Sequence, residues 1–314
     1  MDLIIHHWDA DGICSASLIA RHLAKGDFLN ASPPVGEYRF DERIHRLIEG
    51  ADSVFVADLN VPGEVEGVGK RTIFFDHHIQ PRIKSSVVRQ INPVIEGKNS
   101  ASCAIVVSQH LDTWGAETVI GTVGDAGRSA FSIPEIRKTM ERLGMSENQA
   151  KRLAELVDSS HISGNRAGVE EAVRVILESD WRDLLEYEPW IRQAEEIERE
   201  IEKVLSGVEQ KGNTAFIEFR SKFNIISRVA RALVWSMGFE EALVINRDFN
   251  GKVQLYYRIS REVAPEKGTG RMILDLRSLG ISAGGKEEVV GCVFEPEKFE
   301  QVIEVVKRYV GWLD

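Results

Sequence analysis

The sequence is poor in cysteine and has no long apolar run. Its 314 residues include 3 cysteines that lie far apart and form no CxxC pair, which argues against a disulfide framework and a thiolate zinc site. No apolar run reaches the roughly 18 residues that a membrane span requires. The first residues, MDLIIHHWDADG, lack the basic segment and longer apolar stretch of a secretory signal. These absences predict a cytoplasmic protein with no membrane partner.

Internal repeats and low-complexity tracts are also absent, and the remaining composition is that of a globular protein. Hydrophobic residues make up 43% and charged residues 28% of the chain, which suits a soluble fold. A length of 314 residues exceeds the usual size of one hydrophobic core. We therefore expect two domains.

A net charge of −10 disfavours a polyanionic partner, because phosphates are bound by Lys and Arg. The charge is uneven, however. Residues 1–212 hold 24 basic and 35 acidic side chains, residues 213–314 hold 15 and 14, and the stretch 220–286 holds 12 and 6. The local basic excess either faces phosphates or is an ordinary solvated surface. Bound metal cations would offset the acidic first part.

The first 130 residues alternate short apolar strands with helices. The strands are DLIIHH, SVFVAD and RTIFF, and AIVVSQHL is read as another, before a loop at GTVGDAG. This alternation predicts an α/β fold whose parallel sheet is covered on both faces. Ligands of such sheets bind beyond the carboxyl ends of the strands, where we expect the Asp and His clusters to lie.

The later chain predicts a connector and a second domain. Residues 133–180 read as helices broken at SSHISGN, and WIRQAEEIEREIEKVLSG is a charged amphipathic helix. The strands TAFIEF, EALVINRD and KVQLYYRIS follow, with one helix among them and another at the end. We therefore predict an α/β catalytic domain over residues 1–185, a helical connector over 186–212 and a smaller α/β domain over 213–314.

Four fragments place acids or imidazoles where a predicted apolar strand ends. They are HHWDADG, FVADLN, FFDHHIQ and TVGDAG, which contribute His7, Asp9, Asp11, Asp58, Asp76, His77, His78 and Asp125. Clustered carboxylates are costly without a cation, so their convergence predicts bound metal. Carboxylates with imidazoles and no thiolate favour Mn, Mg or Fe. Asp58, alone at its strand end, is the natural ligand to bridge two ions.

Each fragment alone has a structural interpretation. A lone Asp at a strand end is usually a helix cap or turn former, and Asp9 and Asp11 before Gly12 resemble a calcium loop whose later positions are absent. The DHH triplet is the most specific fragment. On an extended strand Asp76 and His78 would share one side, so the backbone must turn there.

The four fragments resemble the motifs of the DHH family of phosphoesterases. The resemblance extends over most of the chain. This family includes RecJ-type exonucleases, oligoribonucleases, cyclic-dinucleotide phosphodiesterases and manganese pyrophosphatases. The resemblance implies two Mn²⁺ ions, with Mg²⁺ as the alternative. The implied ligands are His7, Asp9 and Asp58 for one ion, and Asp11, Asp58, His77 and Asp125 for the other.

The resemblance also implies roles for the other two residues of the triplet. Asp76 would orient an imidazole, and His78 would lie beside the scissile phosphate and stabilise its charge. The alternative for His78 is a purely structural role. Pyrophosphatases carry a histidine four residues before the first aspartate, where this chain has Ile5, which disfavours that subfamily.

The second domain resembles the substrate-binding domain of many DHH relatives, whose signature is GGH. Here SAGGKEEVVG places Gly284 and Gly285 in that motif and Lys286 at the histidine position. Arg258 of LYYRIS corresponds to an arginine of relatives, with Arg261 as a neighbouring alternative. Lysine supplies a point charge for a phosphate. Of the two tyrosines before Arg258, either one stacks on a base or both are packing residues.

The sequence therefore predicts a Mn²⁺-dependent exonuclease that shortens single-stranded DNA or RNA, with 3′ to 5′ polarity taken from the resemblance to archaeal DHH nucleases. Asp58, Asp76 and His78 are the predicted catalytic residues. One alternative is an enzyme for short substrates: an oligoribonuclease, a 3′-phosphoadenosine 5′-phosphate phosphatase or a cyclic-dinucleotide phosphodiesterase. Another is a non-catalytic scaffold for replication or repair. A repair protein such as a helicase is a further expected partner, and self-association into a homo-oligomer is compatible with the sequence.

Overall fold

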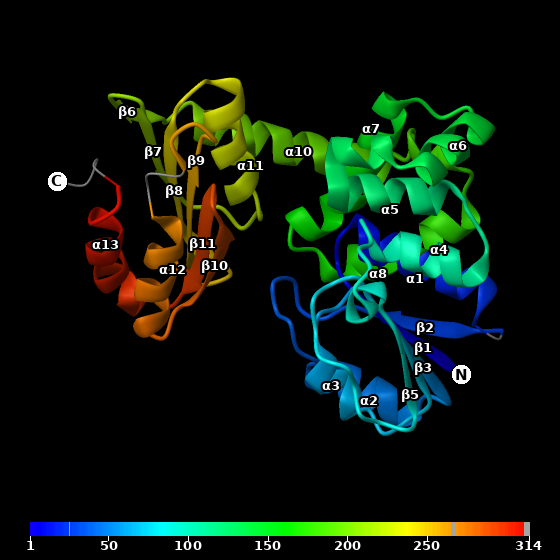
Figure 1. Ribbon diagram of the computed structural model, residues 1–314. Coiled ribbons are helices and arrows are strands. Elements are labelled where there is room, and N and C mark those ends of the chain that lie inside the picture. The colour runs from blue at the N-terminus through cyan, green and yellow to red at the C-terminus, as the bar shows by residue number, and fades with distance from the viewer. Residues whose placement is uncertain (25, 265–267, 311–314) are drawn as a thin grey trace. The chain divides into compact units, whose positions relative to one another are not determined.

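A computed structural model describes residues 1–24, 26–264 and 268–310. The chain divides into two compact units, Met1–Ala194 and Glu195–Asp314, and each contains one sheet (Figure 1). The division falls inside helix α10 (Glu188–Leu205), the amphipathic helix expected from the sequence. Among the described residues, no helix is both long and apolar enough to cross a bilayer.

The first unit is built on a parallel sheet of five strands in the order β2-β1-β3-β4-β5. The strands are β1 (Asp2–His6), β2 (Phe28–Ala31), β3 (Ser53–Ala57), β4 (Thr72–Phe75) and β5 (Val88–Ile91). The predicted parallel α/β fold is therefore confirmed. Because β1 and β3 are adjacent and β4 follows β3, the carboxyl ends of these three strands lie next to one another at one edge.

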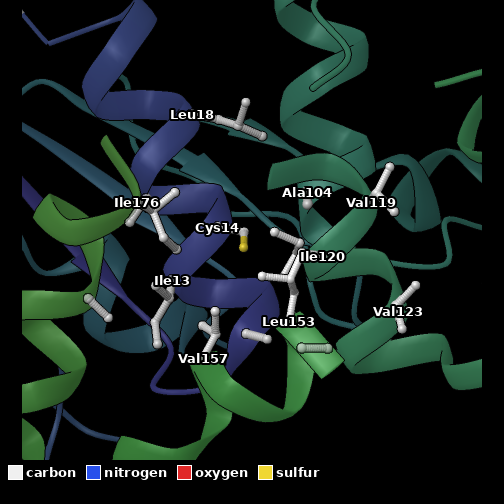
Figure 2. Close-up of a cluster of buried hydrophobic side chains, with 14 of the residues drawn as sticks. Ile13, Cys14, Leu18, Ala104, Val119, Ile120, Val123, Leu153, Val157 and Ile176 are labelled. Carbon is white, nitrogen blue, oxygen red and sulfur yellow. The ribbon is translucent and has the colours of Figure 1, made fainter. Parts of the chain in front are cut away.

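Helices cover both faces of this sheet. They are α1 (Ala10–His22), α2 (Glu42–Gly50), α3 (Pro62–Glu66), α4 (Cys103–Leu111), α5 (Ala116–Ala126), α6 (Pro134–Leu143), α7 (Glu147–Ile162), α8 (Arg166–Glu178) and α9 (Trp181–Leu184). Ile4 and Phe75 point into one core with α1, α4, α5, α7 and α8, whereas their neighbours Ile5 and Phe74 point into another with α2 and α3. Figure 2 shows part of the larger core, where Cys14 of α1 lies among side chains of α5 and α7.

The segment AIVVSQHL is helical, so its interpretation as a strand was wrong. It belongs to α4, and the expected loop GTVGDAG belongs to α5. Both helices are buried on most sides, and a buried helix has the same continuous apolar pattern as a buried strand. Ser102 begins α4 by accepting a hydrogen bond from the backbone N–H of Ile105. Asp125 therefore lies in the last turn of a helix and not at a strand end.

The second unit has a mixed sheet of six strands in the order β10-β11-β9-β8-β7-β6. The strands are β6 (Glu209–Lys211), β7 (Thr214–Phe219), β8 (Glu241–Phe249), β9 (Lys252–Ile259), β10 (Ser282–Lys286) and β11 (Val289–Phe294), of which only β7 and β8 pair in parallel. Helices α12 (Thr269–Ser278) and α13 (Phe299–Lys307) pack on the face that carries Leu255 and Tyr257. Helix α11 (Ile226–Arg231) packs against β8 and β9 and continues into one π-helical turn over Ala232–Ser236.

Candidate metal centre

Four segments of the first unit bring the acidic and imidazole side chains together. His7 and Asp9 follow β1, Asp58 follows β3, and Asp76, His77 and His78 follow β4. Asp11 comes from the first turn of α1 and Asp125 from the end of α5. The structure thus gathers all eight residues that the sequence proposed for the first unit.

His77 is the centre of one group of candidate metal ligands. Its Nε2 lies 3.4 Å from Asp58 Oδ1, 3.6 Å from Asp125 Oδ2 and 3.9 Å from Asp11 Oδ2. Its other ring nitrogen, Nδ1, lies 3.3 Å from the carbonyl oxygen of Ser100. A carbonyl only accepts, so a hydrogen bond here is donated by Nδ1 and leaves Nε2 directed at the carboxylates, where a cation would bind it. Metal-binding histidines commonly have this arrangement.

A second group forms around His7. Its Nδ1 lies 2.8 Å from Asp9 Oδ1 and 3.7 Å from Asp58 Oδ2. Asp9 also caps α1, because its Oδ1 accepts a hydrogen bond from the backbone N–H of Gly12. Asp58 presents one carboxylate oxygen to His7 and the other to His77, so it lies between the two groups. His7 with Asp9 and Asp58, and His77 with Asp11 and Asp125, each offer atoms close enough to share one ion.

The N-terminus of α4 holds Asp11 in place. Its two carboxylate oxygens accept hydrogen bonds from the backbone N–H groups of Cys103, at 2.6 Å, and Ala104, at 2.8 Å. The side chain is almost completely buried. A helix N-terminus stabilises negative charge, so this carboxylate has a fixed position beside the cluster.

Asp76 turns the chain after β4 and orients His78. Its Oδ1 accepts hydrogen bonds from the backbone N–H groups of His77 and His78 and from Nδ1 of His78, the last at 2.7 Å. Because the chain leaves β4 and turns here, His77 and His78 need not point to alternate sides as residues of a strand do. The hydrogen bond from the His78 ring to Asp76 raises the pKa of His78 against the opposing effect of burial.

Burial makes the charged state of several of these carboxylates costly. It raises the pKa of Asp11 and Asp58 well above the usual range, and the neighbouring carboxylates raise both further. Burial also raises the pKa of Asp125. For Asp9 the effect of burial is outweighed by His7, so its pKa is lowered.

The residues present fit divalent cations. Asp58 Oδ1 and His7 Nε2 are buried and have no hydrogen-bond partner within the described part of the chain. Cations at the two groups would satisfy these atoms and neutralise the carboxylates. Oxygen and imidazole donors without thiolate suit Mn²⁺ or Mg²⁺. Which residues bind metal stays a prediction.

Two side chains near this centre were not recognised in the sequence. His161, near the end of α7, is largely buried, and its Nδ1 has no partner among the residues that the structure describes. Burial lowers the pKa of His161 to about 4, against the opposing charge of Asp9. Partial desolvation beside the cluster and the charges of Asp9 and Asp58 raise the pKa of Tyr38 to about 12, although much of the ring is exposed. Neither residue lies in one of the four fragments, so no local pattern indicated it.

The candidate substrate residues lie in the second unit, on β9 and β10. The register pairs Lys286 with Val289 of β11, and Val289 with Arg258, so Arg258 and Lys286 share a face of the sheet. The Arg258 guanidinium lies 4.4 Å from the ring centroid of Trp235, and its Nε is buried without a hydrogen-bond partner among the described residues. Trp235 itself is 63% exposed.

Of the residues next to Arg258 and Lys286, some are exposed and others are packed inside the unit. Gly284 leaves open space beside β10, whereas a Cβ at Gly285 would lie 1.9 Å from the carbonyl oxygen of Val289. Gly285 therefore has a steric reason to be glycine. Tyr257 is fully buried and its hydroxyl donates to Glu241, so it is a packing residue. Tyr256 is half-buried on the face of Arg258.

Comparisons with known proteins agree with this fold. Residues 3–123 match the sequence model of the DHH family, N-terminal domain. RecJ from Thermus thermophilus in complex with Mn²⁺ is 17% identical with a TM-score of 0.68, covering 98% of this chain and 51% of that one. Exonuclease RecJ bound to manganese is 17% identical with a TM-score of 0.64, covering 98% and 89%.

A third structure, the DHH domain of a protein described as a member of a ribosomal protein family, is 15% identical with a TM-score of 0.68, covering 98% and 85%. This chain spans about half the length of the Thermus protein. No curated protein matches it by sequence. At these identities the likeness shows the fold alone: a parallel α/β domain followed by a second α/β domain with a mixed sheet.

Proposed function

We propose that this chain, whose residues 3–123 match the sequence model of the DHH family, N-terminal domain, is a Mn²⁺-dependent phosphodiesterase that removes nucleotides one at a time from an end of single-stranded DNA or RNA. The observation that carries this proposal is the position of Asp58, whose two oxygens face two separate groups of ligands. Two structures of similar fold are RecJ with manganese, which supports Mn²⁺ as the metal. Mg²⁺ is the alternative.

Each side chain of the centre has a different proposed role in hydrolysis. When bound, two divalent cations would activate water for attack on phosphorus and neutralise charge on the phosphate oxygens. Asp58 is placed to hold both ions in a fixed relation. Asp76 holds the His78 ring, and its hydrogen bond favours the imidazolium. That imidazolium would donate an N–H to a phosphate oxygen and stabilise the charge that develops during hydrolysis.

The second unit supports a nucleic-acid substrate. Arg258 is 9% exposed with its Nε unpaired within the described residues, and Lys286 lies on the same face of the sheet. A phosphate would satisfy the guanidinium. Trp235 covers one side of Arg258 and is largely exposed, and exposed aromatic rings stack on unpaired bases. These residues would bind single-stranded chain without reading its sequence.

The proposal is tested by hydrolysis of end-labelled single strands of two to thirty nucleotides, with Mn²⁺ and with EDTA. Asp58→Asn is expected to lose at least about a hundredfold in rate, because a carboxylate oxygen between the two groups becomes an amide. Asp112→Asn is the matched control, since Asp112 also has a positive φ but is exposed at the end of α4. Equal activity of wild type and Asp58→Asn would contradict the site.

The lengths of the products separate the related activities. A ladder on long strands supports the exonuclease. A labelled end that is retained throughout the ladder is the end opposite to attack, which gives the polarity; we propose 3′ to 5′. Cleavage confined to the shortest strands would instead indicate the enzyme for short substrates. Hydrolysis of no strand would indicate the scaffold. Docking on a repair protein such as a helicase and self-association stay proposals.

A further inference from the structure

We propose that Tyr38 is a specificity residue that stacks on the base of the terminal nucleotide whose phosphodiester bond is hydrolysed. This inference rests on the proposed function, since it assigns a nucleoside contact to the same site. It begins from an aromatic ring beside the metal centre that the fold does not bury.

Tyr38 lies directly against the group of candidate ligands around His7. Its ring centroid is 5.9 Å from that of His7, and the two planes are 25° apart, as in a stacked pair. It also forms an edge-type ring contact with Trp8, with centroids 5.2 Å apart and planes at 60°. Trp8 is buried, whereas Tyr38 is 58% exposed. The ring is therefore supported on one side and open to solvent on the other.

Tyr38 belongs to the segment 32–41, and both ends of this segment form hydrogen bonds or ion pairs with side chains of α8. Arg166 Nε donates to the carbonyl of Ser32 at 2.6 Å, and its Nη1 pairs with Asp41. Glu170 accepts a hydrogen bond from the backbone N–H of Ser32 at 3.0 Å.

Two further contacts complete this anchor. Arg43 binds both carboxylate oxygens of Glu170, at 2.6 and 2.8 Å. Phe40, two residues after Tyr38, is buried in the core beside α2. Tyr38 thus projects from a segment that is held in place before any ligand arrives. A preorganised ring loses little conformational entropy when a ligand stacks on it.

The position favours a nucleobase as the ligand. A phosphate held between His7 and His77 carries its nucleoside to one side, and the exposed ring of Tyr38 is next to His7. Flat rings stack on bases with little regard to sequence, which suits an enzyme that shortens a strand of any sequence. A purely structural ring over His7 would leave binding independent of the base.

The test compares two probes of the Mn²⁺-loaded full chain by calorimetry: adenosine 5′-monophosphate and ribose 5-phosphate, which lacks the base. Wild type is expected to bind the nucleotide about tenfold more tightly. Tyr38→Phe should keep this preference because the ring remains. Tyr38→Leu should lose it while ribose 5-phosphate binds as before. Val87→Ala, an exposed apolar residue just before β5 at the opposite edge of the sheet, is the control.

Two results would overturn the inference. In one, Tyr38→Leu keeps the preference for the nucleotide. In the other, Tyr38→Leu weakens the binding of both probes equally, which would mean that Tyr38 only holds His7 in position. Mn²⁺ affinity, measured in the same variants, should not change. Hydrolysis of strands is scored separately, so an inactive wild type that still prefers the nucleotide would reject the proposed function and retain only base stacking by Tyr38.

Discussion

Asp58 has a backbone conformation that few residues with a side chain adopt. Its φ is 61°, its side chain is 3% exposed, and its Oδ1 has no hydrogen-bond partner among the described residues. Left-handed backbone and an unpaired buried carboxylate each cost free energy. Such costs persist where function requires the residue. Asp58 combines both costs at the point between the two groups of ligands, which is the physical argument for its bridging role.

The pair Asp76 and His78 predicts a pH dependence. The hydrogen bond raises the pKa of His78, so the ring keeps its proton to a higher pH than a free histidine does. Asp76→Asn removes the negative partner and lowers that pKa. We expect the alkaline limb of the profile of kcat/KM against pH, measured at saturating Mn²⁺, to move to lower pH. Asp52→Asn, at an exposed aspartate, should leave the profile unchanged; an unmoved limb in Asp76→Asn would contradict the role of His78.

At the scale of residues, the sequence could predict the members of the centre but not their surroundings. His7, Asp9 and the DHH triplet lie in short fragments that combine acids and imidazoles directly after apolar strands, and packing alone seldom requires that combination. Tyr38 and His161 come from segments that reach the centre only through the fold. A single tyrosine or histidine carries no periodicity, so no local pattern could place either one.

At the scale of elements, the close packing of α5 on α1 and α4 positions part of the centre. Gly121 lies where a Cβ would come within 2.9 Å of Ala104 Cβ, 3.0 Å of Asp11 Oδ1 and 3.2 Å of Cys14 Cβ. The same helix carries Asp125 at its end. This packing explains why the wrongly predicted strand and loop are helices: their small and apolar residues fit between other helices. Sequence patterns alone do not separate a buried helix from a buried strand.

Gly121→Ala tests this packing. The added methyl group has no space, so we expect a loss of roughly 1–3 kcal/mol in the free energy of unfolding, measured by urea denaturation. Mn²⁺ affinity should fall as well, because Asp11 must shift. Gly50→Ala in α2 is the control, since nothing lies within 4 Å of its Cβ position, and alanine is the better helix former. Equal losses in both variants would show that α5 does not depend on this contact.

At the scale of the whole molecule, the candidate metal centre and the candidate substrate residues belong to different units. The metal centre lies entirely in the first unit, and the Trp235 and Arg258 pair lies entirely in the second. The sequence places a basic excess in residues 220–286, within the second unit. It could not predict that Trp235 covers Arg258, since the π-helical turn that presents the indole has no sequence signature.

Trp235→Ala in the full chain should therefore weaken binding without changing the chemistry. We expect KM for long single strands to rise between roughly 5-fold and 150-fold, the range given by about 1–3 kcal/mol of base stacking. Hydrolysis of bis(4-nitrophenyl) phosphate, which has no chain to bind, should keep its rate. Leu274→Ala is the control, because Leu274 is equally exposed but lies on α12, which covers the other face of the sheet. If Trp235→Ala slows the hydrolysis of both substrates to the same extent, Trp235 affects the metal centre itself and does not act by binding the nucleic-acid chain.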